Sequence, residues 1–219
     1  MKNLKTYILP ISSLFLSITF LAIGYGIMIT YIGVYLKQAG VSSFSIGLIN
    51  SAFFLGAIAS SIFSQKIIST IGHIRSFASF AALMVIAFLL HSVYLNEFFW
   101  GFLRLISGFS FYALLIIVES WLNEKSSNSQ RGQILAIYTI IFYLSTALGQ
   151  LFLTISKDSE FFVFTVGSVL VLFSLITIAM TKIKEPILKP FEQYSFPKLY
   201  SIVPLALTGS FIGGFFVGS

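Results

Sequence analysis

Hydrophobic residues occur in long unbroken blocks that are separated by short charged segments. Six blocks of about 20 residues or more contain no Asp, Glu, Lys or Arg, at residues 6–36, 38–65, 76–96, 132–156, 161–181 and 199–219. A further block, 98–123, is interrupted only by Arg104 and Glu119. Because a helix crosses the hydrocarbon core in roughly 20 residues, the pattern predicts six complete membrane spans and a seventh that begins near Leu199.

The first block is a retained helix rather than a cleaved signal peptide. The apolar region of a signal peptide has about 7–15 residues, and block 6–36 is longer and is followed by further spans. Small residues recur every fourth position in several blocks, as in the run Ala52, Gly56, Ser60 and Ser64, and in the pairs Ala22 with Gly26 and Ser145 with Gly149. Such spacing is typical of membrane helices that pack closely.

Composition agrees with a membrane protein. Hydrophobic residues make up 57% of the 219 residues and charged residues only 9%, with a mean hydropathy of +0.97. A soluble domain carries about 25% charged residues, so a soluble enzyme and a disordered tail are excluded. The sequence contains no cysteine, which excludes disulfides and cysteine metal sites. The expected fold class is an all-α integral membrane protein that lies in lipid.

The positive charges gather on one side of the membrane. Counting the N-terminus and every second loop gives ten of them, at Lys2, Lys5, Lys66, Arg75, Lys125, Arg131, Lys182, Lys184, Lys189 and Lys198. The opposite side holds Lys37 and Lys157. By the positive-inside rule, we expect a multi-pass protein of the inner (plasma) membrane with a cytoplasmic N-terminus. The basic charge therefore reflects topology and not nucleic-acid binding.

A proline-containing segment divides the chain. Residues 182–198 include Pro186, Pro190 and Pro197 among alternating charges, and proline interrupts a helix. The expected organisation is a six-helix bundle over residues 1–181, a cytoplasmic linker over 182–198 and an incomplete seventh helix over 199–219.

Arg104 is the most informative polar residue within a span, because a charge inside a membrane is costly and commonly functional. It lies about 9 Å into its helix, at 1.5 Å per residue. Tyr31, Asn50 and Gln150 fall at a similar depth from the same, non-cytoplasmic side. Together they would form a polar layer around a cavity, where a guanidinium group can bind a carboxylate. The alternative is that Arg104 bonds backbone carbonyls of neighbouring helices and only stabilises the bundle.

Glu119 lies near the cytoplasmic end of the same span. An apolar environment favours the protonated form of a carboxyl group, so Glu119 could carry a proton. The alternative, which we favour, is an ion pair with Arg75 or Arg131, which the topology places on the same side.

Enzymatic chemistry finds no support in the sequence. There is no phosphate-binding G-x-x-x-x-G-K-[ST] loop, the two histidines are 18 residues apart, and no serine has an evident His and Asp partner. We expect no enzyme activity, no cofactor and no metal.

Several stretches resemble the major facilitator superfamily of transporters. Residues 65–75, which include Gly72 and Arg75, fall where that family has its loop signature between spans two and three. The run from Arg104 to Gly108 is similar to the Arg-x-x-x-Gly motif that the family uses in proton coupling, and the run from Arg131 to Tyr138 resembles the start of the fifth helix. The resemblance implies a six-helix N-terminal half, with Gly72, Arg75 and Arg131 as candidates for a cytoplasmic gate or latch.

The runs 35–42, 119–123 and 143–150 are similar to the YcaD-like branch of this family. The acidic residue of the loop signature would fall at Ser69, so Glu119 is a candidate to replace it. The family has twelve helices, and this sequence extends into the seventh.

Two functions therefore remain open. The resemblance implies a proton-coupled secondary transporter that moves a small molecule, by uptake or efflux, through alternating access, with a C-terminal half as the partner of this bundle. The alternative is a truncated or half-size membrane protein that does not transport and needs a partner half.

Overall fold

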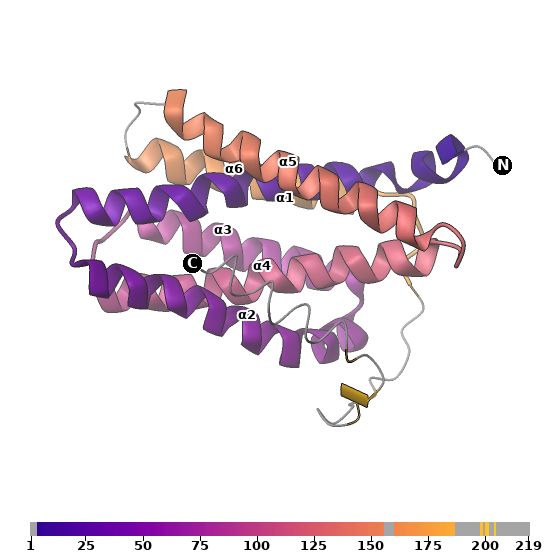
Figure 1. The fold of residues 1–219 in the computed structure, drawn as a ribbon, viewed down its shortest axis with the longest axis horizontal. Helices are drawn as coiled ribbons and strands as arrows, with labels where there is room; N and C mark the ends of the chain where they lie inside the picture. Colours follow the sequence, from indigo (N-terminus) through magenta and orange to yellow (C-terminus); the bar gives the residue numbers. More distant parts are fainter. Residues whose placement is uncertain (1–3, 156–159, 187–197, 199, 202–203, 205–219) are drawn as a thin grey trace. The chain divides into compact units, whose positions relative to one another are not determined.

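The computed structural model describes residues 4–155, 160–186, 198, 200–201 and 204. These residues form α1 (Leu4–Gln38), α2 (Ser43–Ile71), α3 (His73–His91), α4 (Glu97–Lys125), α5 (Arg131–Ile155) and α6 (Glu160–Ala179), shown in Figure 1. Six helices of this part of the chain are long and apolar enough to cross a membrane. The expected all-α fold with six spans is confirmed. The chain divides into two compact units, residues 1–188 and 189–219. Most of the expected linker and nearly all of the expected seventh helix lie outside the described residues.

Local capping decides where the helices begin and end. The Ser42 hydroxyl accepts a hydrogen bond from the Ser45 amide at 3.1 Å, and the Asn96 side chain accepts one from the Phe99 amide at 3.0 Å. Such caps satisfy amides that have no acceptor within the helix. The glycines Gly40 (φ 79°) and Gly72 (φ 92°) provide the left-handed conformations after α1 and between α2 and α3. At the other end of α3, the Ser92 amide bonds to the carbonyl oxygens of Leu89 and Leu90, and the helix ends at His91. This end is earlier than the charge-free block 76–96 suggested.

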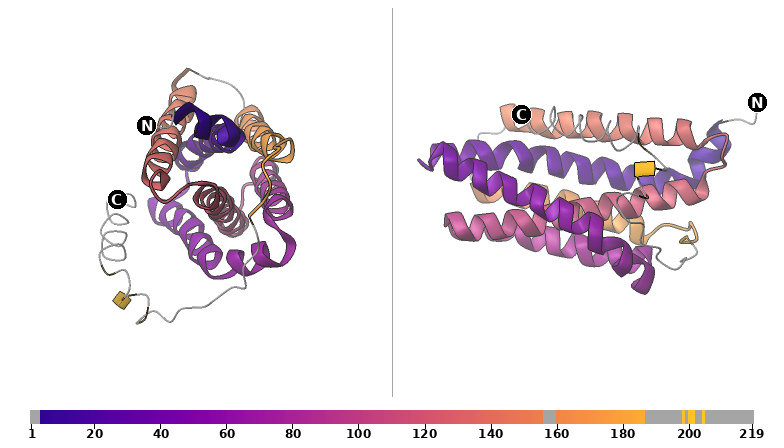
Figure 2. Two further views of the ribbon diagram at one scale, coloured as in Figure 1. Left: turned by 90° about the vertical axis from the view of Figure 1, so that its right-hand side faces the viewer. Right: turned by 60° about the horizontal axis from the view of Figure 1, so that its bottom comes forward.

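The helices pack in pairs that repeat a common arrangement. The principal pairs are α2 with α4, α1 with α5, α1 with α6, α3 with α4, and α3 with α6, and the end-on view of Figure 2 shows α1 lying beside α5 and α6. Suppose that the labels of α1, α2 and α3 are swapped with those of α4, α5 and α6, respectively. The α2–α4 pair then becomes α5–α1, and the α3–α4 pair becomes α6–α1. Both resulting pairs are among the observed ones, so the helix pairing is the same for the units α1–α3 and α4–α6, as expected of inverted repeats.

Glycines produce the closest approaches between helices. A Cβ atom on Gly108 of α4 would overlap the Phe53 carbonyl oxygen of α2, and one on Gly56 of α2 would overlap the Leu105 carbonyl oxygen of α4. The related pair α1–α5 uses Gly26 against Thr146 and Gly149 against Ile23 in the same way. The small residues expected to mediate packing thus lie at two equivalent interfaces.

Candidate translocation site

Arg104 lies in the interior of the bundle, on the α4 surface that packs against α2. Its side chain is 2% exposed. One guanidinium nitrogen, Nη2, donates a hydrogen bond to Asn50 Oδ1 at 3.3 Å, and the guanidinium carbon lies 4.4 Å from the centre of the Phe53 ring. This contact between a cation and an aromatic face is attractive. The partner of Arg104 is therefore a side-chain amide together with a ring, rather than the backbone carbonyls of the alternative interpretation.

The Arg104 charge has no acidic counter-ion among the residues that the structure describes. In the same part of the chain, its Nε atom is buried and has no hydrogen-bond partner. A buried cation without a paired anion is energetically unfavourable, and leaving a donor unsatisfied adds to that penalty. The Arg104 guanidinium therefore keeps one unsatisfied donor inside the described part of the bundle.

Gly108 explains how Phe53 comes to lie beneath Arg104. Because Gly108 has no side chain, the α4 backbone contacts the α2 backbone at Phe53. Arg104 precedes Gly108 by one helical turn, so its guanidinium lies on the same face of α4. The Arg-x-x-x-Gly spacing thus combines close helix packing with the placement of the buried cation.

The other two members of the expected polar layer, Tyr31 and Gln150, have different surroundings. Tyr31 packs in an aromatic group at ring distances of 6.0 Å from Tyr35 and 5.4 Å from Phe164. Gln150 is exposed on α5. Of the four residues of the expected layer, the structure joins Arg104 and Asn50 by a hydrogen bond.

An aromatic cluster that the sequence interpretation missed lies beside Arg104. The Tyr25 ring of α1 stacks on the Phe111 ring of α4, with the ring centres 4.0 Å apart. Its centre also lies 5.9 Å from that of Phe53 of α2 and 6.3 Å from that of Phe142 of α5. Tyr25 interacts electrostatically with Arg104. The cluster unites one aromatic residue from each of α1, α2, α4 and α5. Its only signal in the sequence is that Tyr25 directly precedes the packing glycine Gly26.

Glu119 has a different partner from the one that the sequence suggested. It is half-buried, and its carboxyl group interacts electrostatically with the Tyr138 side chain of α5. Arg75 and Arg131 are both exposed at the ends of α3 and α5, and neither forms an ion pair with Glu119 in the described structure. The contact joins the last third of α4 to the first third of α5.

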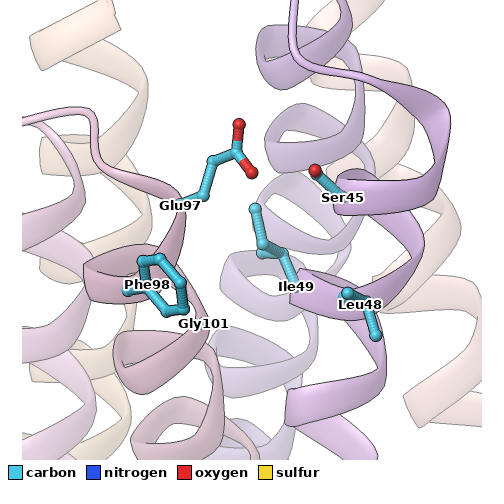
Figure 3. Close-up of a pocket in the computed structure, with 6 residues that line it drawn as sticks. All are labelled: Ser45, Leu48, Ile49, Glu97, Phe98 and Gly101. Atoms are coloured by element: carbon cyan, nitrogen blue, oxygen red, sulfur yellow. The ribbon is translucent and has the colours of Figure 1, made fainter.

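A pocket of about 230 Å³ opens between the start of α2 and the start of α4, at the opposite end of α4 from Glu119. It is lined by Ser45, Leu48, Ile49, Glu97, Phe98 and Gly101, and Figure 3 shows the Ser45 hydroxyl and the Glu97 carboxylate facing the same opening. Ile49 is adjacent to Asn50, and Gly101 is one turn from Arg104. The pocket therefore lies between the end of the bundle and the Arg104–Asn50 pair.

Comparison with known proteins assigns the family. Residues 14–219 match the family model of the Major Facilitator Superfamily. The chain is 23% identical over 218 residues to the uncharacterized MFS-type transporter YcaD of Salmonella newport, covering 99% of this chain and 57% of that protein. It is 26% identical over 148 residues to YcaD of Salmonella arizonae, covering 68% of this chain and 39% of that protein. The chain spans about half the length of the relatives it matches. From this match over most of its length, the chain belongs to the major facilitator superfamily.

Proposed function

We propose that this chain forms the N-terminal half of a proton-coupled secondary transporter, and that a small molecule crosses the membrane beside Arg104 by alternating access. The observation that carries the proposal is the buried Arg104 charge, which is held by Asn50 and Phe53 and has no acidic counter-ion in the described residues. Intramembrane charges commonly mark a substrate or proton pathway.

The charge of Arg104 favours an anionic substrate group. A guanidinium presents a planar set of donors that matches a carboxylate or phosphate, and the free Nε supplies one of them. The aromatic cluster around Tyr25 offers an apolar surface next to that charge. We therefore expect a small organic anion, taken up or expelled, as the transported molecule.

Proton coupling is the second part of the proposal. Arg104 and Glu119 of α4, the latter beside Tyr138 of α5, are the candidates for responding to a proton, because their side chains are partly or fully removed from water. Gly72, Arg75 and Arg131 lie at the ends of α2, α3 and α5, on the side that the positive-inside rule assigns to the cytoplasm. A cytoplasmic gate would form at these ends. The same orientation places the N-terminus in the cytoplasm, in a protein of the inner membrane.

The cavity itself requires a second half. In this family the substrate site lies near the midplane, between two six-helix halves. The relatives are nearly twice as long as this chain. Helices α2 and α5 are the least buried within the bundle, which fits faces that a C-terminal half would cover.

Transport in membrane vesicles tests the proposal. The protein is expressed from its own gene in a host that lacks related transporters, and vesicles with an imposed pH gradient are supplied with radiolabelled benzoate, succinate and glycerol 3-phosphate. We expect gradient-dependent movement of at least one anion, its loss in Arg104→Ala with normal membrane insertion, and partial retention in Arg104→Lys.

Lys37→Ala is the matched control, because it removes an exposed positive charge from the end of α1. Equal transport by Arg104→Ala and Lys37→Ala would exclude Arg104 from the mechanism. Movement that does not respond to the pH gradient would exclude proton coupling.

A further inference from the structure

The segment that follows α6 lies against the ends of α3 and α4 and is fastened there by specific contacts. The Trp121 indole nitrogen of α4 donates a hydrogen bond to the Lys184 carbonyl oxygen at 3.1 Å. Ile183 is half-buried and packs against the hydrophobic core. Residues 182–186 therefore belong to the packed bundle, although their sequence has the charges and the proline of an exposed linker.

Glu185 makes the most specific of these contacts. Its Oε2 atom accepts hydrogen bonds from the backbone amides of His73 at 2.9 Å and Ile74 at 3.3 Å. These are the first two residues of α3, and amides at a helix start have no acceptor within the helix. A carboxylate at this position also interacts favourably with the positive end of the helix dipole. Glu185 therefore caps α3 from a position 112 residues away in the sequence.

The turn between α2 and α3 is shaped to receive this carboxylate. Gly72 has φ 92°, and a Cβ atom there would lie 3.0 Å from Glu185 Oε2. The next residue, His73, shares a hydrogen bond of 2.9 Å between its Nε2 atom and the Ser120 hydroxyl, and its ring packs edge-on against Trp121. The residues that hold Lys184 and Glu185 are thus connected to one another.

We propose that Glu185 is an acidic latch that fastens the segment after α6 to the ends of α3 and α4. Residues 183–185 are then held beside the start of α3, and the negative charge of Glu185 is what keeps them there. Glu185 is a positioning residue: it sets where the connection to the following part of the protein begins, without contacting the Arg104 site.

The accessibility of Ile183 tests the latch. The 219 residues contain no cysteine, so Ile183→Cys introduces the only thiol of this chain. Its reaction rate with N-ethylmaleimide is measured in the full-length protein in detergent, where the rate follows the fraction of time that the segment is detached if reattachment is fast. Losing a helix-capping side chain shifts such an equilibrium about tenfold.

We expect Glu185→Ala to raise the labelling rate of Ile183→Cys about tenfold. Glu185→Asp should keep most of the protection, and Glu185→Gln should lose most of it, since a neutral amide oxygen is a weaker acceptor for the helix dipole. Glu97→Ala is the matched control, because Glu97 is an exposed carboxylate in the first turn of α4, at the opposite end of that helix from Trp121, and it should leave the rate unchanged.

Two results would overturn the latch. The first is an equal labelling rate in the Glu185→Ala and Glu97→Ala backgrounds, which would show that Glu185 holds nothing specifically. The second is simultaneous exposure of a cysteine placed at Ala81, which is fully buried in α3. Exposure at both positions would mean that Glu185 stabilises the bundle as a whole rather than the position of one segment.

Discussion

Replacing Gly108 by alanine tests whether the close approach of α2 and α4 positions the buried cation. A methyl group at residue 108 would overlap the carbonyl oxygen and the carbonyl carbon of Phe53. Both obstructing atoms belong to the α2 backbone, so no rotation of a side chain can relieve the overlap. The two helices must separate, and Phe53 must move relative to the Arg104 guanidinium.

The magnitude follows from the packing. Inserting a methyl group into a well-packed interface costs about 1–3 kcal/mol. Separation by on the order of 1 Å also weakens the dispersion contacts along the interface by a quarter to a half. For a protein of this size, 1 kcal/mol corresponds to about 2–4 °C in Tm. We therefore expect Gly108→Ala to lower the Tm by ~5 °C.

Gly101→Ala is the matched control on the same helix. A Cβ atom on Gly101 meets nothing within 4 Å, so this change should leave the Tm unchanged or raise it slightly, because alanine favours helix over glycine. The assay is thermal unfolding of the purified protein in detergent, followed by the loss of the monodisperse peak in size-exclusion chromatography. Equal Tm values for Gly108→Ala and Gly101→Ala would refute the packing argument.

Three further predictions concern other parts of the bundle. Exchanging the charges of Glu119 and Arg131 should not restore the thermal stability lost in Glu119→Arg, because Glu119 interacts with the Tyr138 side chain and forms no ion pair with Arg131 in the described structure; recovery in the double variant would support the ion pair instead. Asn96→Ala removes the cap of α4 and should reduce stability by about 1 kcal/mol, measured against Asn128→Ala, an exposed loop residue. In intact cells, an impermeant maleimide should label a cysteine at Val93 and not one at Ser127, and the reverse labelling would invert the proposed topology.

The positions of the helices could be predicted because the membrane imposes a simple length requirement. Every charge-free block of the described part contains most of one observed helix, and the block interrupted by Arg104 and Glu119 corresponds to α4 (Glu97–Lys125). The boundaries differ by several residues where caps determine them, as at Ser42 and Gly72. Hydropathy responds to the lipid environment and not to these local hydrogen bonds.

The depth of the site residues along their helices could be predicted from the sequence, but the direction in which each side chain points could not. Counting residues from the helix ends correctly placed Arg104 and Asn50 at one level, and they form a hydrogen bond. The same count grouped Tyr31 and Gln150 with them, but depth does not specify which way a side chain points around its helix. Tyr31 therefore packs towards Phe164, and Gln150 is exposed on α5.

Contacts between distant segments were beyond the reach of sequence patterns. Glu119 was matched with arginines on the basis of charge, but its neighbour is the uncharged Tyr138. Glu185 gave no signal because its role depends on the end of α6 lying beside the start of α3. The correspondence between the two sets of helix pairs depends on which helices contact one another, and Gly26 and Gly108 occupy equivalent contacts within it.

Water access to the middle of α5 tests the central claim most directly. Tyr143 of α5 and Phe173 of α6 are both exposed apolar positions within spans, and Tyr143 interacts electrostatically with Tyr25 beside Arg104. If the bundle is one half of an alternating-access transporter, a cysteine at Tyr143 faces an aqueous cavity and a cysteine at Phe173 faces lipid. In the full-length protein in membranes, a hydrophilic maleimide should therefore label the first and not the second. Absence of labelling at both positions would place the α5 face in lipid and contradict the proposed transport pathway.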